Sequence, residues 1–561
     1  MARKNLLDRI AGRLAMMHVS NLTRRFFKAA ERATAVQDEL LAGVLARHAD
    51  SDFGREHHFD RIRNYADFKA NLPIRSYADF APYIDRLCRG EVKALFHPGE
   101  KILMFALTSG TTAKPKYIPI TPQVLADSRR GWGVWGGKAV LDHPDVFLRH
   151  ILQVTSPMDD HRTASGVPCG AITGLLASTQ KKLVLRYYTS PLAIARISDA
   201  LSKYYTIMRL AIPRDVAWVV TANPATLLLL AKTANDRCEQ MIRDIRDGAL
   251  SKDLPVAADI RAELAPRLRP DPTCARRLET IIAKQGAMYP KHYWNLGFRA
   301  HWCGGTMGLY ESQFPRYYGQ VPARDIGLIA SEGRMSIPVD DGTASGILAI
   351  GSQFFEFIPA EAYDAALGRE VPTLRSHELR EGEEYFLVLT NAGGLYRYDM
   401  GDRVRVTGRL GQAPLIEFLS RDAHTASMAG EKLTEDQVVM AMRQVCDEGP
   451  TPIVDFVLAP RWGEVPRYRL YVEADAARRL DRLHERLDRA LGEVNLEYAS
   501  KRSSLRLEAV ELAELPDGAL SLRDETLRRR RAGTSEQFKH QYLLPRPEMD
   551  RDLEQVPSGA A

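Results

Sequence analysis

Apolar and polar residues recur with helical spacing over the first fifty positions of the chain. Leu40, Leu41, Val44 and Leu45 fall on one face and charged residues on the other, which predicts an amphipathic helix that packs through its apolar side. From position 65 to 91 the pattern indicates short helices interrupted by proline. Residues 120–230 alternate helical stretches with short apolar runs, such as 183–185 and 217–220, which is typical of an α/β domain.

The pattern changes from helices to hairpins in the following part of the chain. Residues 231–285 are charged and helical, with breaks at prolines. Apolar runs follow at 346–350, 354–358 and 384–390, and the last of these ends in a glycine-containing turn at 391–394. Such runs predict antiparallel hairpins. We therefore expect an α/β fold whose large N-terminal domain has mixed β-sheets flanked by helices and a small β-rich subdomain.

The composition changes again after residue 420. The small, polar stretch 420–430 is typical of an interdomain linker. Beyond it the pattern predicts a compact α+β domain, with helices over 434–445 and 477–494 and strands over 453–458, 467–473 and 504–512. The expected segments are an N-terminal domain at 1–420, a hinge linker at 421–433, a small α+β domain at 434–546 and a loose tail at 547–561.

Length and composition limit the class of protein. A chain of 561 residues is too long for one core, and 45% hydrophobic with 26% charged residues is ordinary for a globular protein. The net charge of +6 is compatible with an anionic substrate and far from what nucleic-acid binding alone predicts. The scattered cysteines indicate free thiols in a reducing compartment. The apolar runs are too short to span a membrane, and Arg24-Arg25 lacks the apolar segment of an export signal. We expect a cytoplasmic protein without a membrane or nucleic-acid partner.

A loop after a short apolar run is the first candidate for chemistry. The run Met104-Phe-Ala-Leu is followed by Thr108, Ser109, Gly110, Thr111 and Thr112, and then by Lys114 and Lys116. Small residues let the backbone approach a polyphosphate, hydroxyl and N–H groups donate to its oxygens, and lysines supply countercharge. The spacing is not that of a Walker loop. On these residues alone, a phosphate site and an ordinary surface turn fit equally well.

Two downstream carboxylates are candidates for the same chemistry. Glu332 follows Ser331 at the end of a strand-like run, where a carboxylate can hold Mg²⁺, although a solvated turn residue would give the same pattern. Asp402 follows a glycine and could accept hydrogen bonds from the vicinal hydroxyls of a ribose. By contrast, His301 and Cys303 lack a second ligand pair and only weakly indicate a metal site. The Gly- and Trp-rich segment 131–137 fits either a pocket wall or simple packing.

These motifs occur in a fixed order along the chain. The loop 108–116, Ala330-Ser-Glu332 and Tyr396-x-x-x-x-Gly-Asp402 are followed by Arg421-Asp422 and a late lysine. This arrangement resembles the adenylate-forming superfamily, which includes acyl-CoA synthetases, luciferases and peptide-synthetase adenylation domains. Ala113 stands where that superfamily has its second glycine, which changes how near the backbone can approach phosphate.

Longer stretches narrow the resemblance to one family. Residues 77–86, 354–359, 394–398 and 533–539 look like the auxin-responsive-promoter family of acyl-acid amido synthetases, whose plant members join carboxylic acids to amino acids. The resemblance runs from about Ala33 to Arg546. This chain departs from the plant pattern in two places. The plant pattern Tyr-Ala-Ser-Ser-Glu is replaced by Leu328-Ile-Ala-Ser-Glu332, and residues 540–544 intervene between Lys539 and Pro545-Arg546, so the final turn must differ.

The resemblance implies a two-step reaction with ATP and Mg²⁺. A carboxylate attacks the α-phosphate of ATP to give an acyl-adenylate and pyrophosphate, and an amine, expected to be that of an amino acid, then displaces AMP. The implied catalytic residues are Lys539 and Glu332, with Glu332 holding Mg²⁺. The implied nucleotide-binding residues are Thr108, Ser109, Gly110, Thr111, Thr112, Lys116, Ser331, Asp402, Arg421 and Lys432. A mobile C-terminal domain would close over the site and exclude water.

Two other functions stay open at this point. The acyl group could pass to coenzyme A or a carrier thiol after the same adenylation step, or the protein could be a catalytically silent nucleotide-binding regulator. The presence of Glu332, Asp402 and Lys539 together argues against the regulator, since a protein that only bound AMP would not need all of them.

Overall fold

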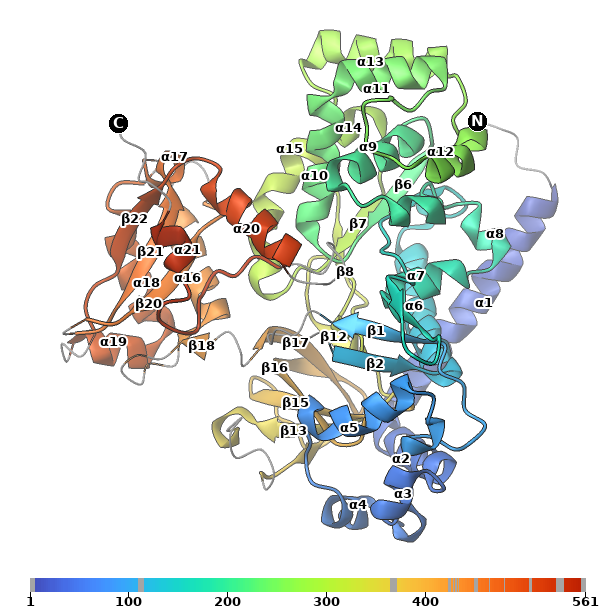
Figure 1. Ribbon diagram of the computed structural model, residues 1–561, viewed down its shortest axis with the longest axis vertical. Helices are drawn as coiled ribbons and strands as arrows, with labels where there is room; N and C mark the ends of the chain where they lie inside the picture. Colours follow the sequence, from blue (N-terminus) through green and yellow to red (C-terminus); the bar gives the residue numbers. More distant parts are fainter. Residues whose placement is uncertain are drawn as a thin grey trace.

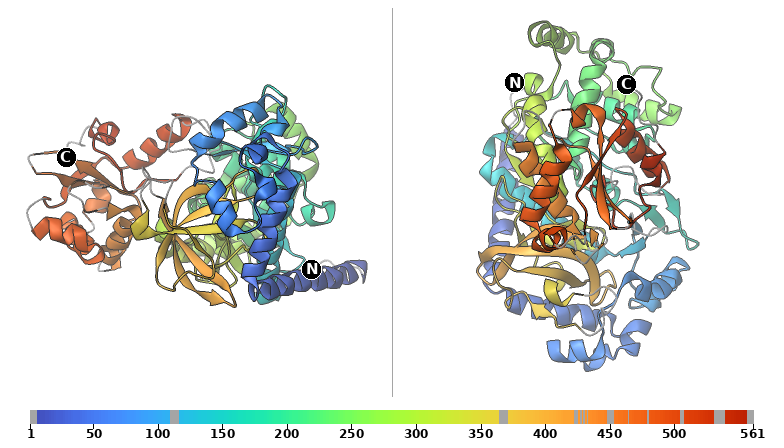
Figure 2. Two further views of the ribbon diagram at one scale, coloured as in Figure 1. Left: turned by 90° about the horizontal axis from the view of Figure 1, so that it is seen from below. Right: turned by 90° about the vertical axis from the view of Figure 1, so that its left-hand side faces the viewer.

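The chain forms a large body and a smaller one beside it (Figure 1). The computed structural model describes residues 6–108, 116–363, 371–421, 425–426, 428, 431, 433–447, 453–463, 465–478, 480–503, 507–530 and 539–555. The buried apolar clusters follow the two bodies: three large clusters and one small one contain only residues before 420, and two contain only residues after 425. From the side, the smaller body lies in front of the larger one (Figure 2).

The N-terminal region is helical and packs by close backbone approach. It contains α1 (Leu6–Ala30), α2 (Ala33–His48), α3 (Asp52–Glu56), α4 (Tyr65–Asn71) and α5 (Tyr77–Cys88), so the amphipathic stretch predicted over the first fifty residues is two helices. α1 packs against α6 (Pro122–Asp142), where a Cβ on Gly137 would lie 2.6 Å from a methyl of Val19. The Gly- and Trp-rich segment of α6 therefore serves packing, with Trp135 buried.

A parallel sheet forms the upper part of the large body in Figure 1. Its strand order is β3 (His150–Gln153), β6 (Val216–Val220), β7 (Phe298–His301) and β8 (Ala323–Asp325), and every neighbouring pair is parallel. Residues 183–185, predicted as a strand-like run, lie instead in the short helix α8 (Lys182–Leu185); three apolar residues cannot fix a period. The surrounding helices are α7 (Ile172–Ser178), α9 (Ala200–Ala211), α10 (Pro224–Asp236), α11 (Cys238–Asp247), α12 (Ala258–Leu264), α13 (Pro272–Gln285), α14 (Pro290–Tyr293), η6 (Gly305–Gln313) and α15 (Phe314–Tyr318).

The predicted hairpins form a seven-stranded sheet. Its order is β11 (Ser336–Ile337), β12 (Gly346–Leu348), β17 (Ala413–Arg421), β16 (Tyr398–Leu410), β15 (Glu384–Thr390), β13 (Phe354–Pro359) and β14 (Leu374–Arg375), all antiparallel. A separate sheet has the order β2 (Lys116–Ile120), β1 (Met104–Thr108), β5 (Pro168–Gly170) and β4 (His161–Arg162). β1 and β2 are antiparallel neighbours on either side of residues 109–115, which lie outside the described residues.

The smaller body is an α+β unit on a three-stranded sheet. β20 (Val457–Arg461) pairs antiparallel with β21 (Arg467–Glu473), which pairs in parallel with β22 (Glu511–Leu515). The first and third strands begin later than the sequence pattern predicts. The helices are α16 (Glu435–Asp447), α17 (Ala474–Ala477), α18 (Leu483–Val494), α19 (Leu496–Ser503), α20 (Ala519–Arg530) and α21 (Arg551–Glu554), and the short pair β18 (Thr425–Ala426) and β19 (Leu433–Thr434) precedes them.

The end of the chain differs from the loose tail predicted from residue 547. Leu553 is 1% exposed and packs with Val457 and Leu544, and the Tyr471 hydroxyl donates to Asp550 at 2.8 Å. An apolar side chain in a polar stretch thus holds residues 550–554 on the small body. All six cysteines carry free thiols, as expected, and among the described residues no helix is both long and apolar enough to cross a membrane.

Candidate active site

A cavity lies where the two bodies meet. The segments that follow β7 and β8, strands β16 and β17, and the chain after α20 all contribute to it. Its walls are formed by Trp302, Gly304, Met307, Asp325, Gly327, Leu328, Ile329, Ala344, Asp402, Phe418 and Lys539. The carboxyl ends of parallel strands are where ligands bind in α/β sheets, and a boundary between bodies is a second common position.

Two of the predicted site residues face this cavity with opposite charges. Asp402, on β16, has no exposed surface, and Lys539 places its ammonium 4.5 Å from the ring centroid of Trp302 and 6.0 Å from that of Phe418. An ammonium over an aromatic face is attracted by the ring quadrupole. Because Lys539 belongs to the small body and the others belong to the large one, the cavity is completed by contact between the bodies.

A second group joins the predicted residues Lys116 and Glu332. Glu332 and Ser331 form the turn between β9 (Ile329–Ala330) and β10 (Gly333–Arg334), and both are buried. The Lys116 ammonium donates to the Tyr398 hydroxyl at 3.3 Å, and that hydroxyl lies 3.5 Å from Glu332 Oε1. The amide of Asn391 also donates to the backbone carbonyl of Glu332 at 2.7 Å. Tyr398 therefore links the start of β2 to this turn.

A buried ion pair holds the backbone next to Tyr398. Arg397 has a left-handed φ of 47° and is 5% exposed, and Glu356 on β13 is 1% exposed. The guanidinium donates to Glu356 Oε1 at 2.8 Å from Nη2, to both carboxylate oxygens from Nε, and to the Leu72 carbonyl at 2.6 Å from Nη1. Left-handed backbone is unfavourable for a non-glycine residue, so these contacts compensate for it. They join residues 354–359 and 394–398, two stretches that carry the family resemblance.

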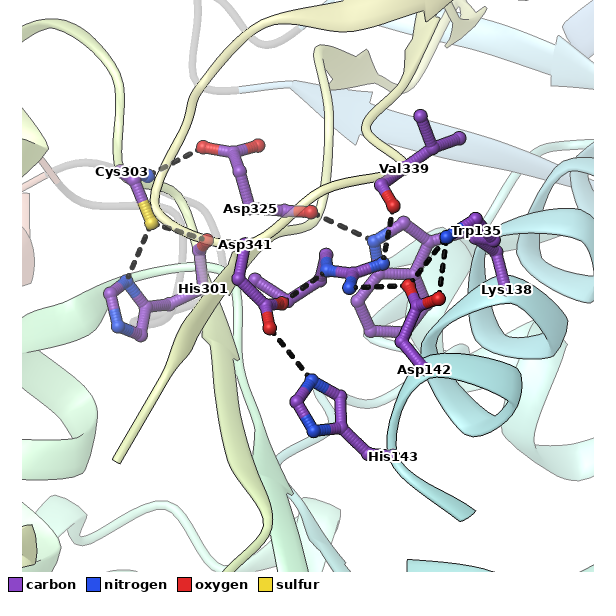
Figure 3. A network of polar contacts seen from close by, with 10 residues as sticks. Trp135, Lys138, Asp142, His143, His301, Cys303, Asp325, Val339 and Asp341 are labelled. Atoms are coloured by element: carbon purple, nitrogen blue, oxygen red, sulfur yellow. Dashed lines mark hydrogen bonds and ion pairs between the residues drawn. The ribbon is translucent and has the colours of Figure 1, made fainter. Parts of the chain in front are cut away.

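Asp325 holds the loops that form the cavity wall (Figure 3). It is the last residue of β8, and its carboxylate accepts from the backbone N–H groups of Cys303 and Gly327, both at 2.6 Å. Its own carbonyl accepts from Trp135 Nε1 at 2.8 Å. Burial raises the pKa of Asp325 to about 7, although the backbone donors oppose that shift. Asp325 was not predicted from the sequence as a site residue.

His301 and Cys303 belong to a packed network and do not suit a metal ion. Glu311 comes within reach of both, but the Arg299 guanidinium forms an ion pair with Glu311 and donates from Nε to His301 Nε2 at 3.2 Å. The other imidazole nitrogen faces the Trp302 carbonyl at 2.9 Å. Burial lowers the pKa of His301 to about 3 and raises that of the Cys303 thiol. Both ring nitrogens of His301 and the carboxylate of Glu311 thus already have protein partners, so the weak metal indication is not supported.

Several predicted nucleotide-binding residues cannot be compared with this geometry. Ser109, Gly110, Thr111, Thr112 and Lys432 lie outside the described residues. Thr108 ends β1 and Arg421 ends β17, where its backbone is in register with Asp402, but their side chains are not among those described. Within the described part of the chain, the predicted residues therefore occur in two groups: Lys116 with Glu332, and Asp402 with Lys539.

Three family models match consecutive parts of this chain. The GH3 family N-terminal domain matches residues 22–323, the GH3 family central domain matches residues 346–421, and the GH3 family C-terminal domain matches residues 436–548. The chain belongs to the GH3 family. This confirms the resemblance drawn from the motifs.

Curated relatives of this GH3 protein cover most of its length. It is 25% identical to a jasmonoyl–L-amino acid synthetase, JAR4 of Nicotiana attenuata, over 456 residues, which is 76% of each chain. It is 26% identical to the indole-3-acetic acid-amido synthetase GH3.8 of Oryza sativa subsp. indica, over 73% of this chain and 70% of that protein.

Solved structures share the fold. AtGH3.15 acyl acid amido synthetase in complex with 2,4-DB superposes with a TM-score of 0.82 at 21% identity and covers 96% of both chains. A 2-hydroxyisobutyryl-CoA ligase in the postadenylation state gives a TM-score of 0.53 at 13% identity, over 94% of this chain and 92% of that chain. The predicted fold, with a large N-terminal domain and a small C-terminal α+β domain, is confirmed.

Three residues of this GH3 site were not predicted from the sequence: Trp302, Asp325 and Tyr398. Trp302 and Tyr398 sit in stretches that were noted for other reasons, beside His301 and within the motif 394–398. Asp325 directly precedes the strand-like run that ends at Glu332. A carboxylate at the end of a strand was the criterion that selected Glu332, and the same criterion applied to β8 would have found Asp325.

Proposed function

We propose that this GH3 protein is an ATP-dependent acyl-acid amido synthetase. It adenylates a carboxylic acid with release of pyrophosphate and transfers the acyl group to the amine of an amino acid. The observation that carries the proposal is the match of all three GH3 domains in order, together with a cavity that takes Asp402 from one domain and Lys539 from another. The curated relatives named above are amido synthetases, which supports the same reaction.

The cavity suits a nucleotide in its chemistry. Asp402 is a carboxylate on the wall that can accept from ribose hydroxyls, and Trp302 and Phe418 offer aromatic faces. Glu332 would hold Mg²⁺, since a carboxylate oxygen is a ligand that this ion prefers, and the ion would neutralise charge on the ATP phosphates. We place Lys116 and the loop residues Thr108, Ser109, Gly110, Thr111 and Thr112 at the phosphates, and Ser331, Arg421 and Lys432 near the rest of the nucleotide.

We assign to Lys539 the stabilisation of the negative charge that develops during adenylation. The attacking carboxylate and the α-phosphate are both anionic, so an ammonium between them lowers the barrier more than it strengthens ground-state binding. Tyr398 and the Arg397–Glu356 pair keep Lys116 and Glu332 in place. Closure of the small body over the cavity would exclude water and so protect an acyl-adenylate from hydrolysis. The reaction needs no nucleic acid or membrane partner, and we assign the protein to the cytoplasm.

Exchange of labelled pyrophosphate into ATP tests the adenylation step. A panel of carboxylic acids is crossed with amino acids, and the products are identified by mass. The proposal expects acid-dependent exchange and an amide product. Replacing Lys539 by Ala should abolish exchange with little change in AMP binding. If ATP binds but no acid supports exchange, the proposed enzymatic activity is contradicted. If coenzyme A gives a thioester and no amide forms, the proposed transfer to an amine is contradicted.

A further inference from the structure

The residues that follow Lys539 depart from the family pattern and have a defined structure here. In the plant pattern the lysine is soon followed by Pro-Arg, whereas residues 540–544 intervene in this chain. Tyr542, Leu543 and Leu544 have no exposed surface. The Leu458 N–H donates to the Tyr542 carbonyl at 2.7 Å, and the Leu544 N–H donates to the Leu458 carbonyl at 2.9 Å. The intervening segment therefore forms an isolated parallel β-bridge, Leu543 with Leu458, on the edge strand β20.

His540 connects this bridged segment to Lys539 and lies between two hydrogen-bond acceptors. Its Nδ1 is 2.8 Å from Asp524 Oδ2 on α20, and its Nε2 is 2.8 Å from the carbonyl oxygen of Phe456, just before β20. A carboxylate and a carbonyl can only accept, so both ring nitrogens must donate. The imidazole that satisfies both partners carries a proton on each nitrogen and is positively charged. The residue is 8% exposed, so the surrounding groups hold the imidazole in place.

We propose that His540 is a positioning residue for Lys539: its imidazolium, held between Asp524 and the Phe456 carbonyl, fixes the backbone from which the lysine reaches the cavity. The inference rests on the role proposed for Lys539 in adenylation. The lysine side chain has several rotatable bonds and is exposed, so its position over Trp302 depends on where its backbone is held. The nearest firmly held side chain that follows Lys539 is that of its immediate neighbour, His540.

The charges around His540 make this positioning sensitive to pH. Burial lowers the pKa of His540, but the hydrogen bond and charge of Asp524, the Phe456 carbonyl and the charge of Asp455 together outweigh it, and the pKa lies above 6.5. The groups that face this cluster from the adjoining elements are Asp455, Glu473, Glu435, Tyr542, Tyr310 and Lys232. A raised histidine pKa means that the interaction is complete below pH 6.5 and is lost as the pH rises through the folded-state value.

Replacement of His540 by Gln tests the inference, with Gln541→Ala as the matched control. Gln541 is the next residue and its side chain is half-buried. We expect His540→Gln to lower kcat for pyrophosphate exchange about tenfold or more, since a misplaced catalytic group costs up to about a hundredfold, while KM for ATP stays within about twofold. Gln541→Ala should match the wild type. An unchanged kcat in His540→Gln, or equal losses in both variants, would overturn the inference.

The pH dependence separates positioning from a general loss of structure. The ratio of wild-type to His540→Gln kcat cancels the titration of Lys539 and of the substrates, which both proteins share. This ratio should decrease toward one as the pH rises from about 6.5 to about 9.5, because the wild-type imidazolium loses its proton. A ratio that stays constant would show that His540 acts only by packing. If His540→Gln does not fold, Asp524→Asn replaces it. The Asn amide can donate to Nδ1 while Nε2–H donates to the Phe456 carbonyl, so a neutral ring satisfies both partners in this variant but not in the wild type. The variant should keep activity and lose this pH dependence, and a pH profile unchanged from the wild type would contradict the inference.

One measurement does not depend on activity. The imidazole resonance of His540, assigned by its absence in His540→Gln, should titrate with a pKa above 6.5, and a lower value would contradict the inference. If Lys539→Ala keeps full exchange activity, the role of the lysine fails; if Lys539→Ala is inactive while His540→Gln is fully active, only the positioning role fails.

Discussion

Replacing Glu356 by Gln removes the negative charge from the buried ion pair with Arg397. Glu356 and Arg397 are 1% and 5% exposed, and the carboxylate also accepts from the hydroxyls of Tyr65 at 2.9 Å and Thr373 at 3.0 Å. Removing one partner of a buried pair leaves the other charge uncompensated, which costs about 3–5 kcal/mol. The amide oxygen of Gln can still accept one of these bonds, so we expect a loss of about 3 kcal/mol in the free energy of unfolding.

The same sheet supplies a control for this substitution. Glu384, on β15, pairs with Arg403 and Arg405, but its side chain is 23% exposed, so Glu384→Gln should cost less than about 1 kcal/mol. Urea unfolding can be followed by tryptophan fluorescence, because Trp132, Trp135, Trp218, Trp294 and Trp302 lie in the large body and only Trp462 in the small one. If Glu356→Gln shifts the unfolding free energy no more than Glu384→Gln, the ion pair does not stabilise the turn that carries Tyr398.

Three further predictions concern single side chains around the site. Gly131→Ala would place a Cβ 2.5 Å from Arg334 Cδ and should destabilise the protein by about 1–3 kcal/mol. Gly136→Ala, on the same helix with no atom within 4 Å, should stabilise it by up to about 1 kcal/mol. Equal midpoints of the two variants in thermal unfolding would contradict this prediction. Burial raises the pKa of Asp325 to about 7, so between about pH 4 and pH 7 the folded protein binds a proton at Asp325 that the unfolded chain lacks. The stability of the wild type relative to Asp325→Asn should therefore fall as the pH rises through this range. A stability difference that is constant with pH would refute the prediction. Tyr398→Phe removes the hydroxyl between Lys116 and Glu332. The loss of its hydrogen bonds, worth about 1 kcal/mol, should raise KM for MgATP about fivefold. An unchanged KM would contradict this prediction.

The sequence was sufficient for features that depend on local pattern or on ordered motifs. The hairpins at 354–358 and 384–390 form as predicted. The helix predicted over 477–494 begins only at Leu483, although all four leucines predicted on its apolar face, Leu480, Leu483, Leu487 and Leu491, are buried. Asp402 and Lys539, both selected from the motifs, line one cavity, and their roles there stay a prediction. Local pattern failed where a run was too short to fix a period, as at 183–185, which is helical.

The contacts that organise the site join residues far apart in the chain, and no spacing rule predicts them. Arg397 reaches Glu356 and the Leu72 carbonyl, Lys116 reaches Tyr398, and Lys539 reaches Trp302. The same limit applies to the weak metal indication at His301. The sequence gives the His-x-Cys spacing but not the Arg299 guanidinium, which pairs with Glu311 and donates to His301.

The packing of residues 550–554 has a practical consequence for anyone who produces this protein. The family match ends at residue 548, so a shortened gene designed from family boundaries would stop there. Such a chain would lack Leu553, which covers Val457 and Leu544, and would lack Glu554, which pairs with Arg461 and Arg469. Arg469 would keep its pair with Glu511, but Arg461 would lose both Asp550 and Glu554. An uncovered apolar patch beside an arginine that has lost its carboxylate partners favours association between molecules. Expression trials should therefore keep the chain at least to Gln555, and aggregation of the shorter version would be a sign of this lost cover rather than of a defect in catalysis.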